Sequence, residues 1–226
     1  MLDKVTFTGI DNKTDFKDLV SLKKDYPFVE YGMLVSERNT DKDTDNRYPS
    51  LMILDRFETG LLDLSLHICG KLARDVVKYG NWGPVYDMMG SYMEFFQRIQ
   101  LNVAGMNKIS KELIFPADKD ILIQFTSEHP CLYELYKNPP HVCGFQDASG
   151  GKGIVGTEWM KTDDSYFGYA GGIHSENVLE ILKEIESINK NMFWIDMESS
   201  VRTEEIFDIT KCRKICELID SYKKEA

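Results

Sequence analysis

Short runs of β-branched and aromatic residues alternate with amphipathic segments along almost the whole chain. Eight runs have the length and composition of strands: VTFTGI, VEYGMLVS, LDLSLHIC, RIQLNVAG, ILIQF, HVCGFQD, YFGYAGG and MFWIDMESS. In several of the segments between them apolar residues recur three and four positions apart, which is typical of amphipathic helices. These segments predict helices over residues 15–26, 49–57, 71–80, 82–96, 107–115, 131–136, 175–190 and 210–224.

The alternation of strands and helices predicts a parallel sheet, and eight strands in 226 residues favour a closed (β/α)8 TIM barrel. An open doubly wound sheet is the competing architecture. No low-complexity segment or linker divides the chain, and a hydrophobic content of 42% is ordinary for a protein with a sizeable core. We therefore expect a single domain over residues 1–226.

Charge and cysteine content exclude several classes of partner. A formal net charge of -10 argues against binding to nucleic acid or to an anionic membrane surface. We find no signal-peptide pattern and no membrane-spanning run, and expect a cytoplasmic protein. Five cysteines without a C-x-x-C pair suggest neither a disulfide framework nor a zinc site. Cys212 and Cys216 are four apart on an expected helix, where packing is their ordinary role.

Alternation along the strands places a set of polar side chains inside the barrel. Every second residue of a barrel strand points into the lumen, and active sites lie at the carboxyl ends of the strands. The expected polar mouth contains Thr8, His67, Cys69, Asn102, Asp147, Asp196 and Glu198. Titratable groups that gather in a half-buried mouth are typical of a catalytic or binding site.

Two segments rich in glycine and serine follow the last two strands. YAGGIHSENV ends an apolar run and opens a helix, for which Ser175 is the expected N-cap, and ESSVRT follows the eighth strand. In such barrels a phosphate group commonly lies between these two loops. Backbone N–H groups and one arginine would bind it, from Gly171, Gly172, Ser199, Ser200 and Arg202. A phosphate-bearing small molecule is therefore the expected partner.

Six segments, in order along nearly the whole chain, resemble those of the phosphoribosylanthranilate isomerase family. VTFTGIDNKTD resembles the family's K-I-C-G-I-T, and VEYGMLVS with NRYPS resembles its second strand and S-P-R-Y loop. IQLNVAG resembles Q-L-H-G, and CGFQDASGGKGIVGTEW resembles L-L-D-S with G-G-x-G. YAGGIHSENV resembles A-G-G-L-x-x-E-N-V, and WIDMESSVRT resembles D-V-S-S-G-V-E. The resemblance implies a TIM barrel of tryptophan biosynthesis that opens a ribosyl ring in an Amadori rearrangement, with no metal and no cofactor.

The resemblance also implies roles for residues of this chain. Asp147 matches the family's general acid, and Thr8 stands where the family has its cysteine base. A threonine hydroxyl is too weak an acid to supply a base near neutral pH, so we consider Cys69, which ends the third strand, as an alternative base. The other matches imply substrate contacts, with Arg47 meeting the anthranilate carboxylate and with Asn102, Gly151, Gly171, Gly172, Ser199, Ser200 and Arg202 around the rest of the ligand.

Departures from the family pattern leave three functions open. The histidine of Q-L-H-G is Asn102, the glycine of S-S-G-V is Ser200, and the glutamate after it is Arg202. The first hypothesis is an isomerase that acts on a phosphorylated sugar or sugar-amine by general acid/base chemistry. The second is a non-catalytic relative that binds a phosphate-bearing metabolite or nucleotide. The third and weakest is a different reaction in which Asp196 and Glu198 bind Mg²⁺.

Overall fold

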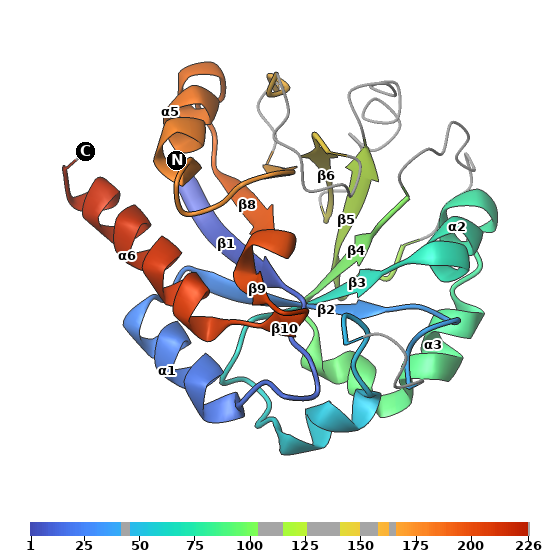
Figure 1. Ribbon diagram of the computed structural model, residues 1–226. Helices are drawn as coiled ribbons and strands as arrows, with labels where there is room; N and C mark the ends of the chain where they lie inside the picture. The colour runs from blue at the N-terminus through green and yellow to red at the C-terminus, as the bar shows by residue number, and fades with distance from the viewer. Residues whose placement is uncertain (42–45, 104–114, 126–140, 150–157, 163–165, 226) are drawn as a thin grey trace.

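Eight parallel strands close into a barrel in the computed structural model, as the strand pattern predicts (Figure 1). Neighbouring strands pair in chain order, and β8 pairs with β1 to complete the ring. The strands are β1 (Leu2–Thr8), β2 (Val29–Val35), β3 (Leu64–Ile68), β4 (Arg98–Leu101), β5 (Asp120–Phe125), β6 (Val142–Asp147), β7 (Phe167–Ala170) and β8 (Phe193–Met197). The structure describes residues 1–41, 46–103, 115–125, 141–149, 158–162 and 166–225.

The described helices surround this barrel (Figure 1). They are α1 (Phe16–Asp25), α2 (Gly70–Tyr79), α3 (Gly83–Met89), α5 (Val178–Ile188) and α6 (Ile209–Glu225), with the 3₁₀ helices η1 (Leu51–Arg56), η2 (Gly90–Phe95) and η3 (Ser199–Val201). The segment expected to be helical over 49–57 is η1, and the segment 82–96 divides into α3 and η2. Except for Phe115, the helices expected over 107–115 and 131–136 lie outside the described residues.

The start of α5 corrects one expectation from the sequence. The helix begins at Val178 with Asn177 as its N-cap, and not with Ser175. The Asn177 side chain accepts a hydrogen bond from the His174 N–H at 2.8 Å and donates one to the Gly172 carbonyl at 2.9 Å. An asparagine amide can accept and donate at once, whereas a serine hydroxyl is too short to link both partners. This side chain therefore connects the helix to the glycine loop that follows β7.

The last helix packs as its apolar spacing predicts. Cys212, Ile215, Cys216 and Ile219 recur three and four residues apart on α6, and all four are buried. Burial raises the pKa of Cys216 to about 12, so its thiol stays protonated near neutral pH. The packing role expected for Cys212 and Cys216 is confirmed.

A buried ion pair lies inside the barrel beneath its mouth. Arg98 Nη1 on β4 lies 3.0 Å from Glu30 Oε1 on β2, and Thr6 on β1 donates to the same oxygen at 2.7 Å. The Arg98 guanidinium also stacks over the Trp194 ring, 4.4 Å from its centroid. Gly168 makes room for that ring, because a Cβ atom there would lie 2.2 Å from it. Side chains thus fill the lower lumen, and a ligand is confined to the mouth.

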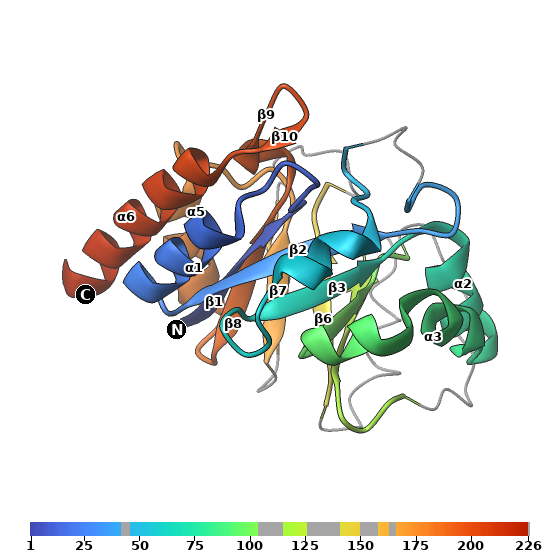
Figure 2. The same cartoon turned by 90° about the horizontal axis from the view of Figure 1, so that it is seen from below.

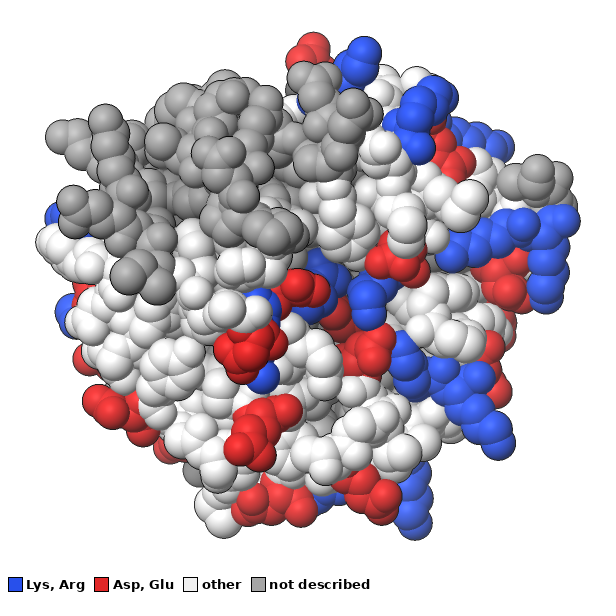
Figure 3. Space-filling model, turned by 180° about the vertical axis from the view of Figure 1, so that it is seen from behind, with Lys and Arg blue, Asp and Glu red and all other residues white. Residues whose placement is uncertain are grey.

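The carboxyl ends of the strands lie together at the end of the barrel that carries the hairpin of β9 (Arg202–Thr203) and β10 (Ile206–Phe207) (Figure 2). On the face shown in Figure 3, acidic and basic side chains are interspersed over the described surface. None of the described helices combines the length and apolar character that a membrane span requires.

Candidate functional site

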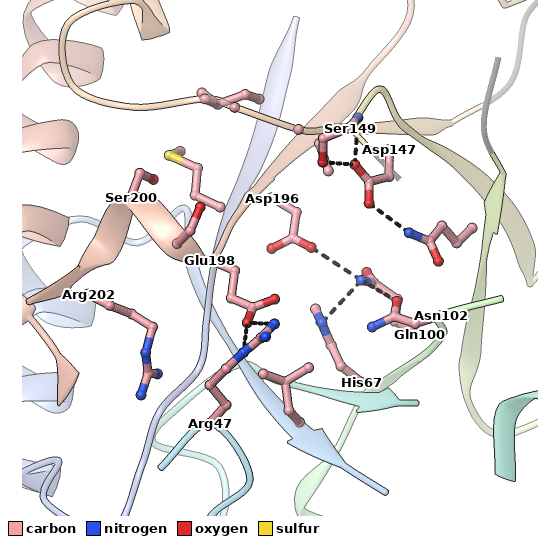
Figure 4. A pocket seen from close by; sticks show the side chains of 18 of the residues that line it. Arg47, His67, Gln100, Asn102, Asp147, Ser149, Asp196, Glu198, Ser200 and Arg202 are labelled. Carbon is pink, nitrogen blue, oxygen red and sulfur yellow. Dashed lines mark hydrogen bonds and ion pairs between the residues drawn. The ribbon is translucent and has the colours of Figure 1, made fainter. Parts of the chain in front are cut away.

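A cavity of about 520 Å³ opens at the carboxyl ends of the strands. Figure 4 shows that its labelled side chains come from several strands and from the loops that follow them. Its wall includes most of the residues expected from the sequence: Arg47, Cys69, Asn102, Asp147, Gly171, Gly172, Ser199, Ser200 and Arg202. Thr8 reaches this site through a hydrogen bond to Asp196, and Gly151 lies outside the described residues.

Asp147 ends β6 with its carboxylate surrounded by hydrogen-bond donors. Gln124 Nε2 donates to Oδ2 at 2.7 Å. The backbone N–H and the hydroxyl of Ser149 donate to Oδ1 at 3.0 and 2.8 Å. Three donors to one carboxylate fix its orientation. Asp147 therefore presents a carboxyl group in a fixed position at the wall of the cavity.

Asp196, near the end of β8, is the second carboxylate directed into the cavity (Figure 4). Its Oδ1 accepts a 2.6 Å hydrogen bond from the Thr8 hydroxyl, and its Oδ2 accepts one from Gln100 Nε2 at 3.2 Å. Burial raises the pKa of Asp196 to about 6, against the opposing effect of these two hydrogen bonds, and the charge of Asp147 adds to the rise. The site thus holds two carboxyl groups in different environments.

Strand alternation predicts that Asp196 lies in the mouth but assigns it no acid or base role. The signal is the strand pattern FWIDM, in which Asp196 shares its face with the buried Trp194. Its raised pKa is caused by burial, and a threonine 188 residues away opposes the rise; neither can be read from local sequence.

The raised pKa of Asp196 makes a prediction for stability. A carboxyl whose pKa is about 6 when folded and 3.8 when unfolded keeps its proton only in the folded state between these two pH values. Its contribution to the free energy of unfolding is therefore largest below about pH 4 and falls by about 3 kcal/mol as the pH rises through 6. Asp196→Asn should abolish this loss, so the variant gains about 3 kcal/mol relative to the wild type between pH 4 and 7.

Urea denaturation at several pH values measures this difference. Asp120→Asn, the same change at an exposed aspartate at the start of β5, is the matched control and should follow the wild-type pH dependence. Parallel stability curves for the wild type and Asp196→Asn would refute the raised pKa.

A neutral histidine lies behind the Thr8 hydroxyl. Burial lowers the pKa of His67 to about 3, so the ring carries no charge near neutral pH. Its Nδ1 lies 3.1 Å from Gln100 Nε2 and 3.4 Å from Thr8 Oγ1. Because the Gln100 amide donates, Nδ1 is an acceptor and the ring proton is on Nε2. A Cβ at Gly32 would lie 2.4 Å from Thr8 Oγ1 and 2.9 Å from this ring, so only glycine fits there.

Thr8 and Cys69 do not have the properties of a general base. The Thr8 hydroxyl is the donor in a hydrogen bond to Asp196 and therefore does not act as an acceptor toward that carboxyl group. Burial raises the pKa of Cys69 to about 11, which keeps the thiol protonated near neutral pH. Its sulfur accepts a hydrogen bond from Asn102 Nδ2 at 3.3 Å, and Tyr48 also bonds to it. These contacts make Cys69 part of the polar wall.

Arg47 and Glu198 form an ion pair on the opposite wall. Arg47 Nε donates to Glu198 Oε1 at 2.6 Å, and a second guanidinium nitrogen contacts the same oxygen. Burial raises the pKa of Glu198, and the positive charge of Arg47 opposes that rise. The arginine expected to meet a substrate carboxylate is thus already paired with a carboxylate of the protein.

The two loops expected to bind phosphate both line the cavity. Gly171 and Gly172 have φ values of 107° and 66°, which favour glycine. A Cβ at Gly171 would lie 2.7 Å from the Ser149 N–H nitrogen, so the loop packs closely on the turn that holds Asp147. Across the cavity, the buried Ser200 hydroxyl has no hydrogen-bond partner within the described part of the chain. Both loops therefore lie where a ligand in the cavity would contact them.

Arg202 is held by the protein itself. Its guanidinium donates to the carbonyls of Gly9 and Glu205 and lies 3.4 Å from Asp11 Oδ2. Asp11 Oδ2 also accepts the Phe207 N–H at 2.7 Å. Figure 4 shows the guanidinium directed away from Asp147 and Asp196. Arg202 therefore fixes the β9–β10 hairpin to the end of β1, and any bond to a ligand would use the remaining face of its guanidinium.

The Mg²⁺ hypothesis would need further metal ligands beside Asp196 and Glu198. Across the described ranges, no group of three or more His, Cys, Asp and Glu side chains is arranged to hold a metal ion.

Comparison with known proteins connects this barrel to one group of solved structures. Comparison of the sequence with protein-family models finds no match, and comparison with the sequences of curated proteins finds none either. In contrast, the phosphoribosyl anthranilate isomerase of Thermus thermophilus superposes with a TM-score of 0.62 at 16% identity, over 97% of this chain and 99% of the other. TrpF of Jonesia denitrificans gives 0.63 at 12% identity, over 97% and 98%.

A third similar structure contains a ligand. It is a phosphoribosyl anthranilate isomerase in complex with reduced 1-(o-carboxyphenylamino)-1-deoxyribulose 5-phosphate. The TM-score is 0.56 at 13% identity, over 98% of this chain and 100% of the other. The class defined by fold and site is thus a (β/α)8 barrel with two carboxyl groups at its mouth. More particularly, the fold of this chain is similar to that of the phosphoribosyl anthranilate isomerases over 97% of its length.

Proposed function

We propose that this chain belongs to the phosphoribosylanthranilate isomerase family and isomerises a phosphorylated sugar-amine by general acid/base catalysis. The observation that carries the proposal is the pair Asp147 and Asp196, which face one cavity from β6 and β8 in different environments. A phosphorylated amino sugar in one of the superposed structures supports this ligand class. The order of motifs in the sequence supports the same family.

The phosphate end of the substrate lies between the loops after β7 and β8. Backbone N–H groups of Gly171 and Gly172 supply donors on one side, and Ser199 and Ser200, whose hydroxyl has no partner among the described residues, supply them on the other. Because the glycine loop packs on the Asp147 turn, a phosphate held there positions the sugar beside Asp147. The sugar then extends across the mouth toward Asp196.

The environments of the two carboxyl groups assign their roles. A carboxyl group whose pKa is raised toward neutral pH is suited to act as the acid. Burial raises the pKa of Asp196, so it is the acid. Asp147, which faces the same cavity and accepts three hydrogen bonds, then takes the role of the base. This reverses the role that the resemblance implies for Asp147, and it needs no cysteine at position 8.

The reaction conserves all substrate atoms. Asp196 gives its proton to the ring oxygen as the bond from that oxygen to C1 breaks, and the nitrogen lone pair forms a C=N bond. Asp147 removes the proton from C2, and the released electron pair forms a C1=C2 bond and returns electrons to nitrogen. The C2 hydroxyl then gives its proton to Asp196 while Asp147 returns its proton to C1, so that a 1-amino-1-deoxyketose phosphate results and both carboxyl groups regain their starting states. The carboxyl pair thus carries one proton at the start and at the end of each cycle.

Exchange of the C1 hydrogens of a product-like compound with solvent tests this proposal, and the test does not require the natural amine to be known. The probe is 1-phenylamino-1-deoxyribulose 5-phosphate in D₂O, with loss of its C1 hydrogens followed by NMR. We expect protein-dependent exchange that slows as the pH rises above about 6, because the pair then loses its proton. Exchange that accelerates from pH 6 to 8 would reverse the assigned roles. No exchange, with a melting temperature that still rises with ribose 5-phosphate, would support the non-catalytic binder instead.

A further inference from the structure

Glu198 directly precedes the Ser199–Ser200 loop, and its side chain extends toward Arg47, with which it forms part of the cavity wall (Figure 4). Arg47 precedes η1 in the loop after β2, and Glu198 follows β8. Their side chains keep 41% and 29% of their surface exposed, so a ligand in the cavity can contact both. Two hydrogen bonds from one guanidinium to one oxygen fix the pair in a defined geometry. The pair therefore acts as one recognition unit.

The pair presents both a donor and an acceptor, and its net charge is zero. A ligand carboxylate would bond to Arg47 but would be repelled by Glu198 at close range. A ligand ammonium would bond to Glu198 but would be repelled by Arg47. A neutral carboxamide satisfies both, because its oxygen accepts from the guanidinium and its N–H donates to the carboxylate.

The charge of the remaining wall also disfavours a ligand carboxylate. The described cavity side chains include five carboxyl groups and two guanidinium groups: Asp147, Asp196, Glu198, Glu204 and Glu205, with Arg47 and Arg202. One of the two cations, Arg202, is held by Asp11. The neighbouring polar side chains Cys69 and Asn102 are uncharged. A second anionic group on a phosphorylated ligand would thus meet a wall in which acids outnumber bases.

We propose that the substrate carries, on the nitrogen side of its sugar, a neutral group with both a donor and an acceptor, of the carboxamide class, where a phosphoribosylanthranilate carries a carboxylate. This inference rests on the proposed function, since it concerns the other end of the same phosphosugar. It gives Glu198 the role of a specificity residue that selects against carboxylates through Arg47.

Two unreactive ligands test the inference by isothermal titration calorimetry. The first is reduced 1-(o-carboxyphenylamino)-1-deoxyribulose 5-phosphate, and the second is the same molecule with a carboxamide in place of the carboxylate. We expect the wild type to bind the carboxamide at least about tenfold more tightly. Glu198→Gln should tighten carboxylate binding about tenfold and remove the preference, because Arg47 is then released from an anionic partner. Glu94→Gln, on η2 at the other end of the barrel, should leave both affinities unchanged.

The outcomes separate the two proposals. Equal affinities, or tighter binding of the carboxylate by the wild type, would overturn the carboxamide inference and leave the isomerase proposal standing. Failure of both ligands to bind would overturn both. The comparison of the two ligands on the wild type is decisive by itself, so the inference does not depend on the folding of the Glu198→Gln variant.

Discussion

Asp147→Asn is expected to slow C1 hydrogen exchange by about 10²–10⁴-fold, the contribution typical of a general base. Asparagine has almost the same shape as aspartate but cannot take up a proton. The Ser149 N–H fixes an oxygen at the Oδ1 position, so the new amide nitrogen faces Gln124, whose own amide must turn to accept from it. The substitution therefore removes basicity with little change in the cavity.

Two measurements distinguish a catalytic loss from a structural one. Exchange is followed by NMR with 1-phenylamino-1-deoxyribulose 5-phosphate, and binding of its reduced form is followed by calorimetry. A loss of exchange with binding kept within about threefold is the expected result. The matched control, Asp120→Asn, changes an exposed aspartate at the opposite end of the neighbouring strand and should keep full activity. An Asp147→Asn variant that retains wild-type exchange would remove Asp147 from the chemistry.

The barrel itself could be predicted from the sequence because its signal is local and repeated. All eight strands lie where the apolar runs predict them, since each run must be buried between a filled lumen and a layer of helices. The ends of an element differ from the predicted ones where a nearby side chain forms hydrogen bonds that the sequence pattern does not show. In α5 the N-cap is Asn177, whose side-chain amide bonds to two loop residues, and the helix begins two residues later than a Ser175 N-cap would place it.

The composition of the mouth could also be predicted, but the pairing of its side chains could not. Alternation placed Asp147, Asp196 and Glu198 at the strand ends. It could not show that Glu198 binds Arg47, 151 residues away, or that Arg202 is held by Asp11. These pairings depend on how distant strand ends converge, and they decide which charges remain for a ligand. A residue type at a strand end therefore predicts a site, whereas its partner determines its role.

The buried acid Glu30 shows what alternation leaves open. In β2 the apolar residues Val29, Tyr31, Met33 and Val35 share one face, so alternation directs Glu30 into the lumen, but it does not show what the carboxylate binds there. Its partner Arg98 lies 68 residues away, on a strand that is not adjacent to β2 in the barrel. The two meet only because the lumen brings alternate strands together.

Removal of the Glu30 charge is expected to destabilise this fold strongly. Glu30→Gln keeps the volume of the side chain but leaves the Arg98 guanidinium without its counter-charge. The Arg98 side chain is only 3% exposed, and its Nε and Nη2 have no hydrogen-bond partner within the described ranges. A buried charge that loses its partner costs about 3–5 kcal/mol of unfolding free energy. Urea denaturation at neutral pH measures this cost.

A double variant then tests whether the cost comes from the unpaired charge. In Glu30→Gln with Arg98→Met, the methionine keeps the contact with the Trp194 ring without a charge, so most of the lost stability should return. Asp75→Asn breaks the exposed pair of Lys71 and Asp75 on α2 and should change stability by less than about 1 kcal/mol. A double variant as unstable as Glu30→Gln would mean that Glu30 acts through its hydrogen bond with Thr6. Recovery would instead show that the ion pair fills the lumen beneath the site at no large net gain in stability, as is common for buried ion pairs.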